Sequence, residues 1–251
     1  MFATEGRGLF APMASGVTFP VPDPEPDPAR LPAPCPVVFD LDGTLVHSAP
    51  DIRLGVNRVM AARGLAAFSL PEIVSYIGNG LPKLTERVMA ARGLAPVRFD
   101  EIYPEIAAAY GAVNGEETRL YPGVADALAR LAARGHRLGV CTNKPLDPAR
   151  DVLARVGVAD LFDVVIGGDS LSVKKPAPEP LIAAFDALGG RGLFVGDSDV
   201  DAETARVCGV PFLLFTEGYR KSPAATLPHT ARFAAFASLG AIVAEVTRTP
   251  V

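Results

Sequence analysis

The chain has 251 residues, which is long enough to bury a sizeable core in one large domain or two small ones. Of these residues 49% are hydrophobic, but no apolar run reaches the roughly 18 residues that a transmembrane helix needs. The formal net charge is −4 and the lysines and arginines are scattered, which argues against a nucleic-acid-binding surface and against a polybasic membrane-binding patch.

The chain opens with residues 1–34, which are predicted to be a disordered, proline-rich tail. Between Pro20 and Pro36 proline stands at nearly every second position, and such a segment neither continues a helix nor pairs as a strand. A docking segment for a proline-recognising domain is the alternative. The start of the chain also lacks a basic stretch followed by an apolar run, so a secretory signal is not expected.

Short apolar runs predict β-strands at residues 37–39, 138–141, 164–166, 193–195 and 211–215. Between the later runs apolar residues recur at helical spacing, in the sets Val124, Leu128 and Leu131, then Val152, Leu153 and Val156, then Leu181, Ile182, Phe185 and Leu188. Buried strands that alternate with amphipathic helices predict an α/β fold, with a Rossmann-like, doubly wound parallel sheet covered on both faces. We assign residues 35–50 and 120–251 to this α/β core.

Residues 51–119 interrupt this alternation, because they contain no convincing strand. Apolar residues at helical spacing form three groups there, which are Ile52, Val56, Val59 and Met60, then Leu84, Val88 and Met89, then Ile102, Ile106, Ala109 and Tyr110. Glycines separate the groups. The segment is therefore predicted to be a small α-helical cap domain, inserted between the first strand and the rest of the sheet.

Two carboxylates directly follow the first strand, in the sequence Asp40-Leu41-Asp42-Gly43-Thr44-Leu45. Side chains of a strand alternate between its faces, so both aspartates can face one site only if the strand has ended and the chain turns. Gly43 permits such a turn. This pair is the strongest functional signal in the chain, and a loop with capping aspartates is the alternative.

Three later segments add polar residues after predicted strands. Thr142 and Asn143 offer a hydroxyl and backbone amides suited to an anion, and Lys175 offers a cation that would neutralise a phosphate. Asp197 and Asp201 lie among acidic residues after a buried strand, where a divalent cation would supply the countercharge. Taken singly, these segments have structural alternatives. The segments at Thr142 and at Asp197 can be helix caps, and Lys175 can belong to a solvated pair with its neighbour Lys174.

The positions of these residues predict a single site. Asp40, Thr142 and Asp197 each follow a predicted parallel strand, and ligands of open α/β sheets bind beyond the carboxyl ends of the strands. Carboxylates without a cluster of histidines and cysteines favour Mg²⁺ as the cofactor. All four polar segments can therefore meet in one crevice.

From residue 35 to residue 251 the chain resembles the haloacid-dehalogenase-like superfamily of phosphohydrolases, whose four motifs occur here in the family's order. Residues 46–84, 141–145, 167–170 and 175–176 are also similar to the bacterial phosphoglycolate phosphatases within it. The resemblance implies that Asp40 is the nucleophile, and that Asp42 first protonates the leaving group and then activates water. It implies that Thr142 and the Asn143 amide hold the phosphoryl oxygens, while Lys175 orients the nucleophile and offsets charge.

The resemblance also implies a metal site and a substrate-contacting loop. Mg²⁺ is expected on the Asp40 carboxylate, the Asp42 backbone carbonyl and Asp197, with Asp201 as a ligand through water or as a lysine partner. The cap is expected to bring three residues near the substrate, Gly78, Asn79 and Gly80. At His47, near the hinge to the cap, relatives usually carry aspartate. The histidine is expected to be hydrogen-bonded locally, and a pH-dependent cap closure near its pKa of about 6.5 is the alternative.

The expected function is Mg²⁺-dependent hydrolysis of a small phosphorylated metabolite, foremost 2-phosphoglycolate, through an aspartyl-phosphate on Asp40. Alternatives are another substrate (a nucleotide, pyrophosphate or a sugar phosphate), a phosphonatase that uses Lys83, or a catalytically silent binding protein on the same fold. The widely spaced cysteines favour a reducing, cytoplasmic location. A monomer or homodimer is expected, with no nucleic-acid or membrane partner.

Overall fold

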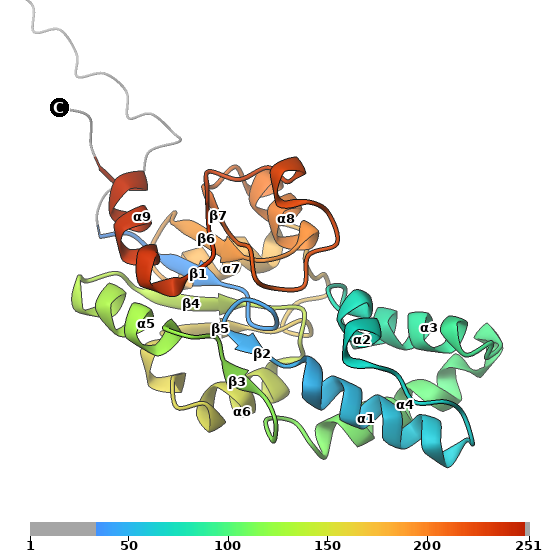
Figure 1. The fold of residues 1–251 in the computed structure, drawn as a ribbon. Helices are drawn as coiled ribbons and strands as arrows, with labels where there is room; N and C mark the ends of the chain where they lie inside the picture. Colours follow the sequence, from blue (N-terminus) through green and yellow to red (C-terminus); the bar gives the residue numbers. More distant parts are fainter. Residues whose placement is uncertain (1–33, 249–251) are drawn as a thin grey trace, which may run out of the picture.

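A parallel sheet of six strands forms the centre of the molecule in the computed structural model, which describes residues 34–248 (Figure 1). The predicted proline-rich tail lies outside the described residues, apart from Pro34. The strands run in the order β5-β4-β1-β6-β7-β8. Their bounds are β1 Val37–Phe39, β4 Leu138–Cys141, β5 Val164–Ile166, β6 Leu193–Gly196, β7 Phe212–Phe215 and β8 Ala231–Phe233.

The order of the strands places β1 between β4 and β6. Val38 of β1 is in register with Gly139 on one side and with Phe194 on the other. The chain adds β4 and β5 on one side of β1 and then crosses to add β6, β7 and β8 on the other. The carboxyl end of β1 therefore lies at the switch point of the sheet, where open α/β folds bind their ligands.

Helices cover both faces of the sheet, as the strand pattern requires. Val37 and Phe39 belong to the hydrophobic core on one face, and Val38 belongs to the core on the other. Side chains from α5 (Val124–Ala133), α6 (Leu146–Arg155) and α9 (Leu239–Val246) fill the first core. Side chains from α7 (Glu179–Ala187) and α8 (Asp199–Cys208) fill the second. The predicted α/β fold is confirmed.

A group of helices lies beside the sheet and has a hydrophobic core of its own (Figure 1). It consists of α1 Ala49–Ala62, α2 Leu70–Tyr76, α3 Leu81–Ala91 and α4 Phe99–Gly111. One residue from each predicted apolar group, Val56, Val88 and Ile106, is fully buried there. The chain enters and leaves through two short antiparallel strands, β2 (Val46–His47) and β3 (Arg119–Leu120). The bounds of this cap as a separate domain stay a prediction.

A few features of the fold differ from the sequence patterns. Strand β8 was not predicted, because its three residues alternate around the exposed Arg232 and make no apolar run. Strands β2 and β3 have two residues each and are likewise too short to produce a recognisable sequence pattern. Ile182 was placed on the buried face of α7 but is 45% exposed. Short 3₁₀ helices complete the fold, at Pro96–Arg98, Ala159–Leu161, Ala224–Thr226 and Phe236–Ser238.

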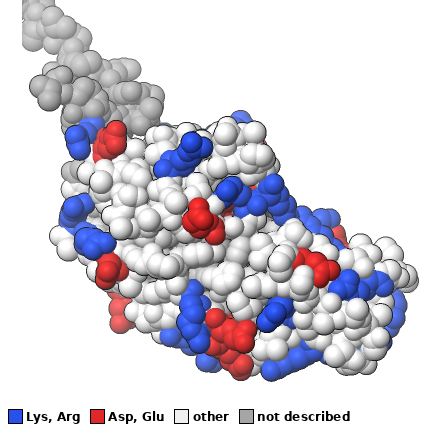
Figure 2. Space-filling model, viewed as in Figure 1, with Lys and Arg blue, Asp and Glu red and all other residues white. Residues whose placement is uncertain are grey.

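Charged side chains are spread over the face of the molecule shown in Figure 2. Lysines and arginines lie on both the sheet part and the helical part, with acidic residues among them. Within residues 34–248, none of the helices combines the length and the apolar character needed to cross a membrane.

Candidate active site

The carboxyl ends of neighbouring strands bring the predicted polar residues together. Asp40 follows β1, Thr142 follows β4 and Asp197 follows β6, and all three are buried. The Lys175 ammonium lies 3.0 Å from Asp40 Oδ1 and 2.6 Å from Asp201 Oδ1. Residues that are far apart in the sequence therefore form one charged cluster at the switch point of the sheet.

Three carboxylates in this cluster are close enough to share a cation. Oxygens of Asp40, Asp197 and Asp201 all lie within 4.8 Å of one another. Asp201 Oδ1 accepts from Lys175, and its Oδ2 accepts from the Ser198 hydroxyl at 2.6 Å and the Ser198 amide at 3.1 Å, which caps α8. Of the two expected roles of Asp201, these hydrogen bonds favour that of lysine partner.

Asp197 is held between two loops at the same edge of the sheet. The Thr44 hydroxyl donates to Asp197 Oδ1 at 2.7 Å, and the Tyr219 amide donates to Oδ2 at 2.5 Å. The packing requires glycine in both loops: Gly43 has a φ of +94° and a Cβ there would lie 2.6 Å from Asp197 Oδ2, while a Cβ on Gly218 would collide with the same carboxylate. The position of Asp197 is therefore fixed.

The electrostatics of the cluster call for a countercharge. Burial, with the charge of Asp201, raises the pKa of Asp40 to about 7, although Lys175 opposes the shift. Burial and the same neighbouring carboxylates raise the pKa of Asp197 well above its usual range. The cluster combines three buried carboxylates with one lysine, and the side-chain atoms that could bind a cation there are all hard carboxylate oxygens. The residues present therefore fit a hard divalent cation such as Mg²⁺.

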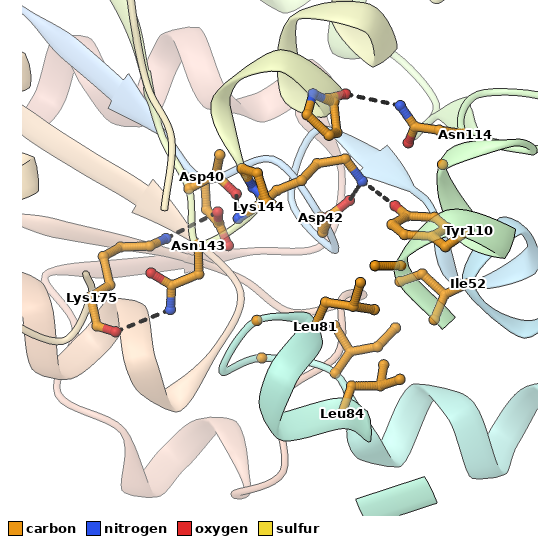
Figure 3. A pocket seen from close by; sticks show the side chains of 18 of the residues that line it. Asp40, Asp42, Ile52, Leu81, Leu84, Tyr110, Asn114, Asn143, Lys144 and Lys175 are labelled. Carbon is orange, nitrogen blue, oxygen red and sulfur yellow. Dashed lines mark hydrogen bonds and ion pairs between the residues drawn. The ribbon is translucent and has the colours of Figure 1, made fainter. Parts of the chain in front are cut away.

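A cavity of about 160 Å³ opens between the charged cluster and the helices α1, α3 and α4 (Figure 3). The sheet side contributes Asp40, Asp42, Thr142, Asn143, Lys144 and Lys175 to its lining, and the helical side contributes Ile52, Leu81, Leu84 and Tyr110. Asn143 Nδ2 donates to the Lys175 carbonyl at 3.0 Å, which ties two of the lining loops together. The cavity is polar at the sheet and largely apolar at the helices.

The expected substrate-contacting loop only partly reaches this cavity. Gly78 and Gly80 line it, but Asn79 is not among the lining residues. The Asn79 side chain accepts from Arg87 Nη2 at 2.9 Å, and its carbonyl accepts from Lys174 at 3.3 Å. Asn79 therefore stabilises the loop.

Lys83, the lysine that a phosphonatase would need, is not in the cavity lining either. Its side chain is 51% exposed and its ammonium pairs with Glu86 at 2.5 Å. A lysine that forms a Schiff base needs a lowered pKa, which burial supplies and exposure does not. The structure thus gives the phosphonatase alternative no support.

Several residues of the site had no role assigned from the sequence. Lys144 is 5% exposed, lies 3.5 Å from Asp42 Oδ1 and donates a hydrogen bond to the Tyr110 hydroxyl. Thr44 and Lys144 stand inside the motifs that sequence reading singled out, so their position was the available signal. Tyr219 lies four residues beyond the end of β7, so its position after a strand was a weaker signal than that of Asp197. Tyr110 gave no signal beyond its helical spacing.

His47 forms a local hydrogen bond near the start of α1. Its Nδ1 lies 2.9 Å from the Tyr219 hydroxyl, which accepts from the Ala49 amide at 3.1 Å. His47 and Tyr219 therefore share a hydrogen bond whose direction depends on the tautomer of the histidine. Burial lowers the pKa of His47, which keeps the ring neutral near pH 7. This geometry favours the local role over a pH switch near neutrality.

The chain is similar to a known class of hydrolases. A family model for haloacid dehalogenase-like hydrolases matches residues 37–209, and the chain belongs to this family. A relative from Cereibacter sphaeroides, named phosphoglycolate phosphatase, is 51% identical over 200 residues, which is 78% of this chain and 92% of that protein.

Solved structures show the same likeness. A protein from Haemophilus somnus, described as a predicted phosphoglycolate phosphatase, superposes with a TM-score of 0.78 at 33% identity and covers 82% of this chain and 96% of its own. The protein CbbY from Rhodobacter sphaeroides, solved in complex with phosphate, has a TM-score of 0.68 at 26% identity and covers 81% and 95%. The chain thus matches these relatives over nearly their whole length.

Proposed function

We propose that this protein hydrolyses a small phosphate monoester, 2-phosphoglycolate, to glycolate and phosphate. The observation that carries the proposal is the Asp40 carboxylate, which lines the cavity while Lys175 neutralises it at 3.0 Å. The likeness to phosphoglycolate phosphatases supports the choice of substrate. A catalytically silent binding protein is disfavoured, because such a protein would have no need of this buried and electrostatically costly cluster.

In the proposed reaction, Asp40 attacks phosphorus and forms an aspartyl-phosphate, which divides a very slow hydrolysis into two easier steps. Asp42 gives a proton to the departing glycolate oxygen and then takes one from the attacking water. Thr142 and the Asn143 amide hold the phosphoryl oxygens, and Lys175 keeps Asp40 oriented and offsets its charge. Asp40, the Asp42 carbonyl and Asp197 would hold Mg²⁺, which would supply the further positive charge that the phosphoryl group needs.

The size of the cavity supports a small substrate over the larger alternatives. Pockets for drug-sized ligands measure about 300–1,000 Å³. The cavity here is about 160 Å³, and the apolar side chains of Ile52, Leu81 and Leu84 close its helical side. A phosphate ester with two carbon atoms suits this space better than a nucleotide or a sugar phosphate.

A substrate panel tests the proposal. The full chain is assayed for phosphate release with Mg²⁺ on 2-phosphoglycolate, pyrophosphate, a nucleoside monophosphate, glucose 6-phosphate and phosphonoacetaldehyde. We expect 2-phosphoglycolate to have the highest kcat/KM, by about tenfold or more, because a polar site strongly rejects substrates that leave its groups unpaired. A flat profile would contradict the choice of substrate, and no release from any ester would contradict the phosphatase itself.

The metal requirement gives a prediction that does not depend on activity. We expect Mg²⁺ to raise the temperature of thermal unfolding, and to raise it more at about pH 8 than at about pH 5.5, because protons and metal compete for ligands. The pKa of Asp40 is raised to about 7, so at the lower pH a proton occupies this carboxyl. Equal shifts at both pH values, or an undiminished shift in Asp197→Asn, would contradict the proposed ligands.

The raised pKa of Asp40 also determines how the stability of the metal-free protein changes with pH. Asp40 has a higher pKa in the folded state than the value of about 3.9 in the unfolded chain. The folded state therefore binds the extra proton, and ionising Asp40 costs stability. Without metal, this contribution to stability is lost as the pH rises from about 4 to about 7.

Cytoplasmic location and a monomeric or homodimeric state remain part of the proposal.

A further inference from the structure

Lys144 is a buried cation in the cavity whose charge the proposed chemistry has not used. It follows Thr142 and Asn143 and extends between Asp42 and Tyr110 (Figure 3). Its ammonium donates to the Tyr110 hydroxyl, lies 4.6 Å from the centre of the tyrosine ring and is 3.5 Å from Asp42 Oδ1. Tyr110 belongs to α4, so this lysine joins the sheet side of the cavity to the helical side.

The Lys144 side chain is buried at the cavity. It is 5% exposed, and its ammonium is held between Asp42 and the Tyr110 hydroxyl. Burial raises the pKa of Tyr110 to about 12, so the phenol stays neutral and accepts a hydrogen bond from the ammonium. A buried ammonium that lines a ligand cavity is a strong attractor for an anion.

The ammonium also has donor capacity to spare. A lysine carries three N–H donors. Among the described residues, the partners of Lys144 Nζ are the Tyr110 hydroxyl and Asp42 Oδ1, and the second lies at 3.5 Å, which is longer than a good hydrogen bond. At least one donor is therefore left for a ligand in the cavity.

The other cation in the cavity lining, Lys175, already has two carboxylate partners. Of the described residues that line the cavity, only Lys144 and Lys175 are positively charged. Lys175 pairs with Asp40 and Asp201 at 3.0 and 2.6 Å, at the end where the nucleophile acts. A second anionic group on the substrate, away from the phosphate, thus has Lys144 as its partner.

We propose that Lys144, positioned by Tyr110, binds the carboxylate of the substrate and makes the enzyme selective for small phosphate esters that carry this second anion. The inference rests on the proposed function and adds to it the residue that determines specificity. The carboxylate is the group that separates 2-phosphoglycolate from an ester of the same length without a second anion, such as ethyl phosphate. The apolar wall of Ile52, Leu81 and Leu84 offers a carboxylate no alternative partner.

The test is the ratio of kcat/KM for 2-phosphoglycolate to kcat/KM for ethyl phosphate. Asp42 shares the Lys144 ammonium, so absolute rates of a Lys144 variant also report on acid–base chemistry, whereas the ratio isolates recognition of the carboxylate. We expect Lys144→Met to lower the ratio about 10- to 100-fold, as loss of one charged hydrogen bond predicts. Lys144→Arg should retain more of the ratio than Lys144→Met, because it keeps the charge.

Lys83→Met is the matched control, because Lys83 is 51% exposed, pairs with Glu86 and is not in the cavity lining. The wild-type protein must itself prefer 2-phosphoglycolate to ethyl phosphate, and this can be measured even if Lys144→Met does not fold. Hydrolysis of both esters with no such preference, or an unchanged ratio in a folded Lys144→Met, would overturn the inference and leave the phosphatase intact. No hydrolysis by the wild type would overturn the proposed function and the inference together.

Discussion

Replacing Asp40 with asparagine is expected to abolish phosphate release, with kcat lowered about 10⁴- to 10⁶-fold, as when the nucleophile of a covalent mechanism is lost. An amide of the same shape is too poor a nucleophile to form the phosphoryl intermediate. The fold should persist, because Lys175 keeps Asp201 as a partner at 2.6 Å. Without metal, the variant should be at least as stable as the wild type near pH 8, because burial and Asp201 raise the pKa of Asp40 to about 7 and its ionisation is costly.

The measurement pairs steady-state kinetics with thermal unfolding of Asp40→Asn. The same exchange at Asp147, an exposed aspartate in the first turn of α6, is the control and should alter neither readout. A folded Asp40→Asn protein that retained a tenth of the wild-type rate, roughly 1.4 kcal/mol of barrier, would rule out Asp40 as the nucleophile.

Much of the sheet side of the site was predictable because of its topology. Val37–Phe39 and Leu193–Val195 are continuous apolar runs, which is how strands buried on both faces read in a sequence. Parallel strands that are neighbours in a sheet end at one edge. Polar residues that follow such strands, as Asp40 and Asp197 do, are brought together whatever the loops between them contain.

The helical side of the cavity was less accessible to sequence reading. Helical spacing predicts that Tyr110 faces the interior of the helical group, but the spacing does not say where that group lies against the sheet. The pairing of Tyr110 with Lys144 depends on this docking, and so does the position of Asn79, which interacts with Arg87 and Lys174 instead of lining the cavity. Contacts between two packed units are set by tertiary geometry, which local patterns do not record.

The role of Lys175 as the countercharge of the cluster leads to a large expected effect on stability. Lys175→Met should lower the free energy of unfolding of the metal-free protein by about 3–5 kcal/mol, the usual cost of removing one partner from a buried ion pair. The loss is expected because Asp40 and Asp201, which lie 3.0 and 2.6 Å from the ammonium, are left with uncompensated charge. Phosphate release should also fall, by about 10²- to 10³-fold, as a charge on the reacting centre is lost. Urea unfolding and kinetics measure the two effects.

A double-mutant cycle with Asp201→Asn separates charge from packing in this prediction. Asparagine keeps an oxygen that can accept from Ser198 and cap α8, but it removes one of the carboxylate charges that Lys175 neutralises. The double variant should therefore regain part of the stability that Lys175→Met loses, with a coupling energy of about 0.5–3 kcal/mol. Its activity should not recover, because Asp40 still lacks its cation. Additive losses of stability would mean that Lys175 acts through the packing of its side chain, and that the cluster tolerates its negative charge by some other means.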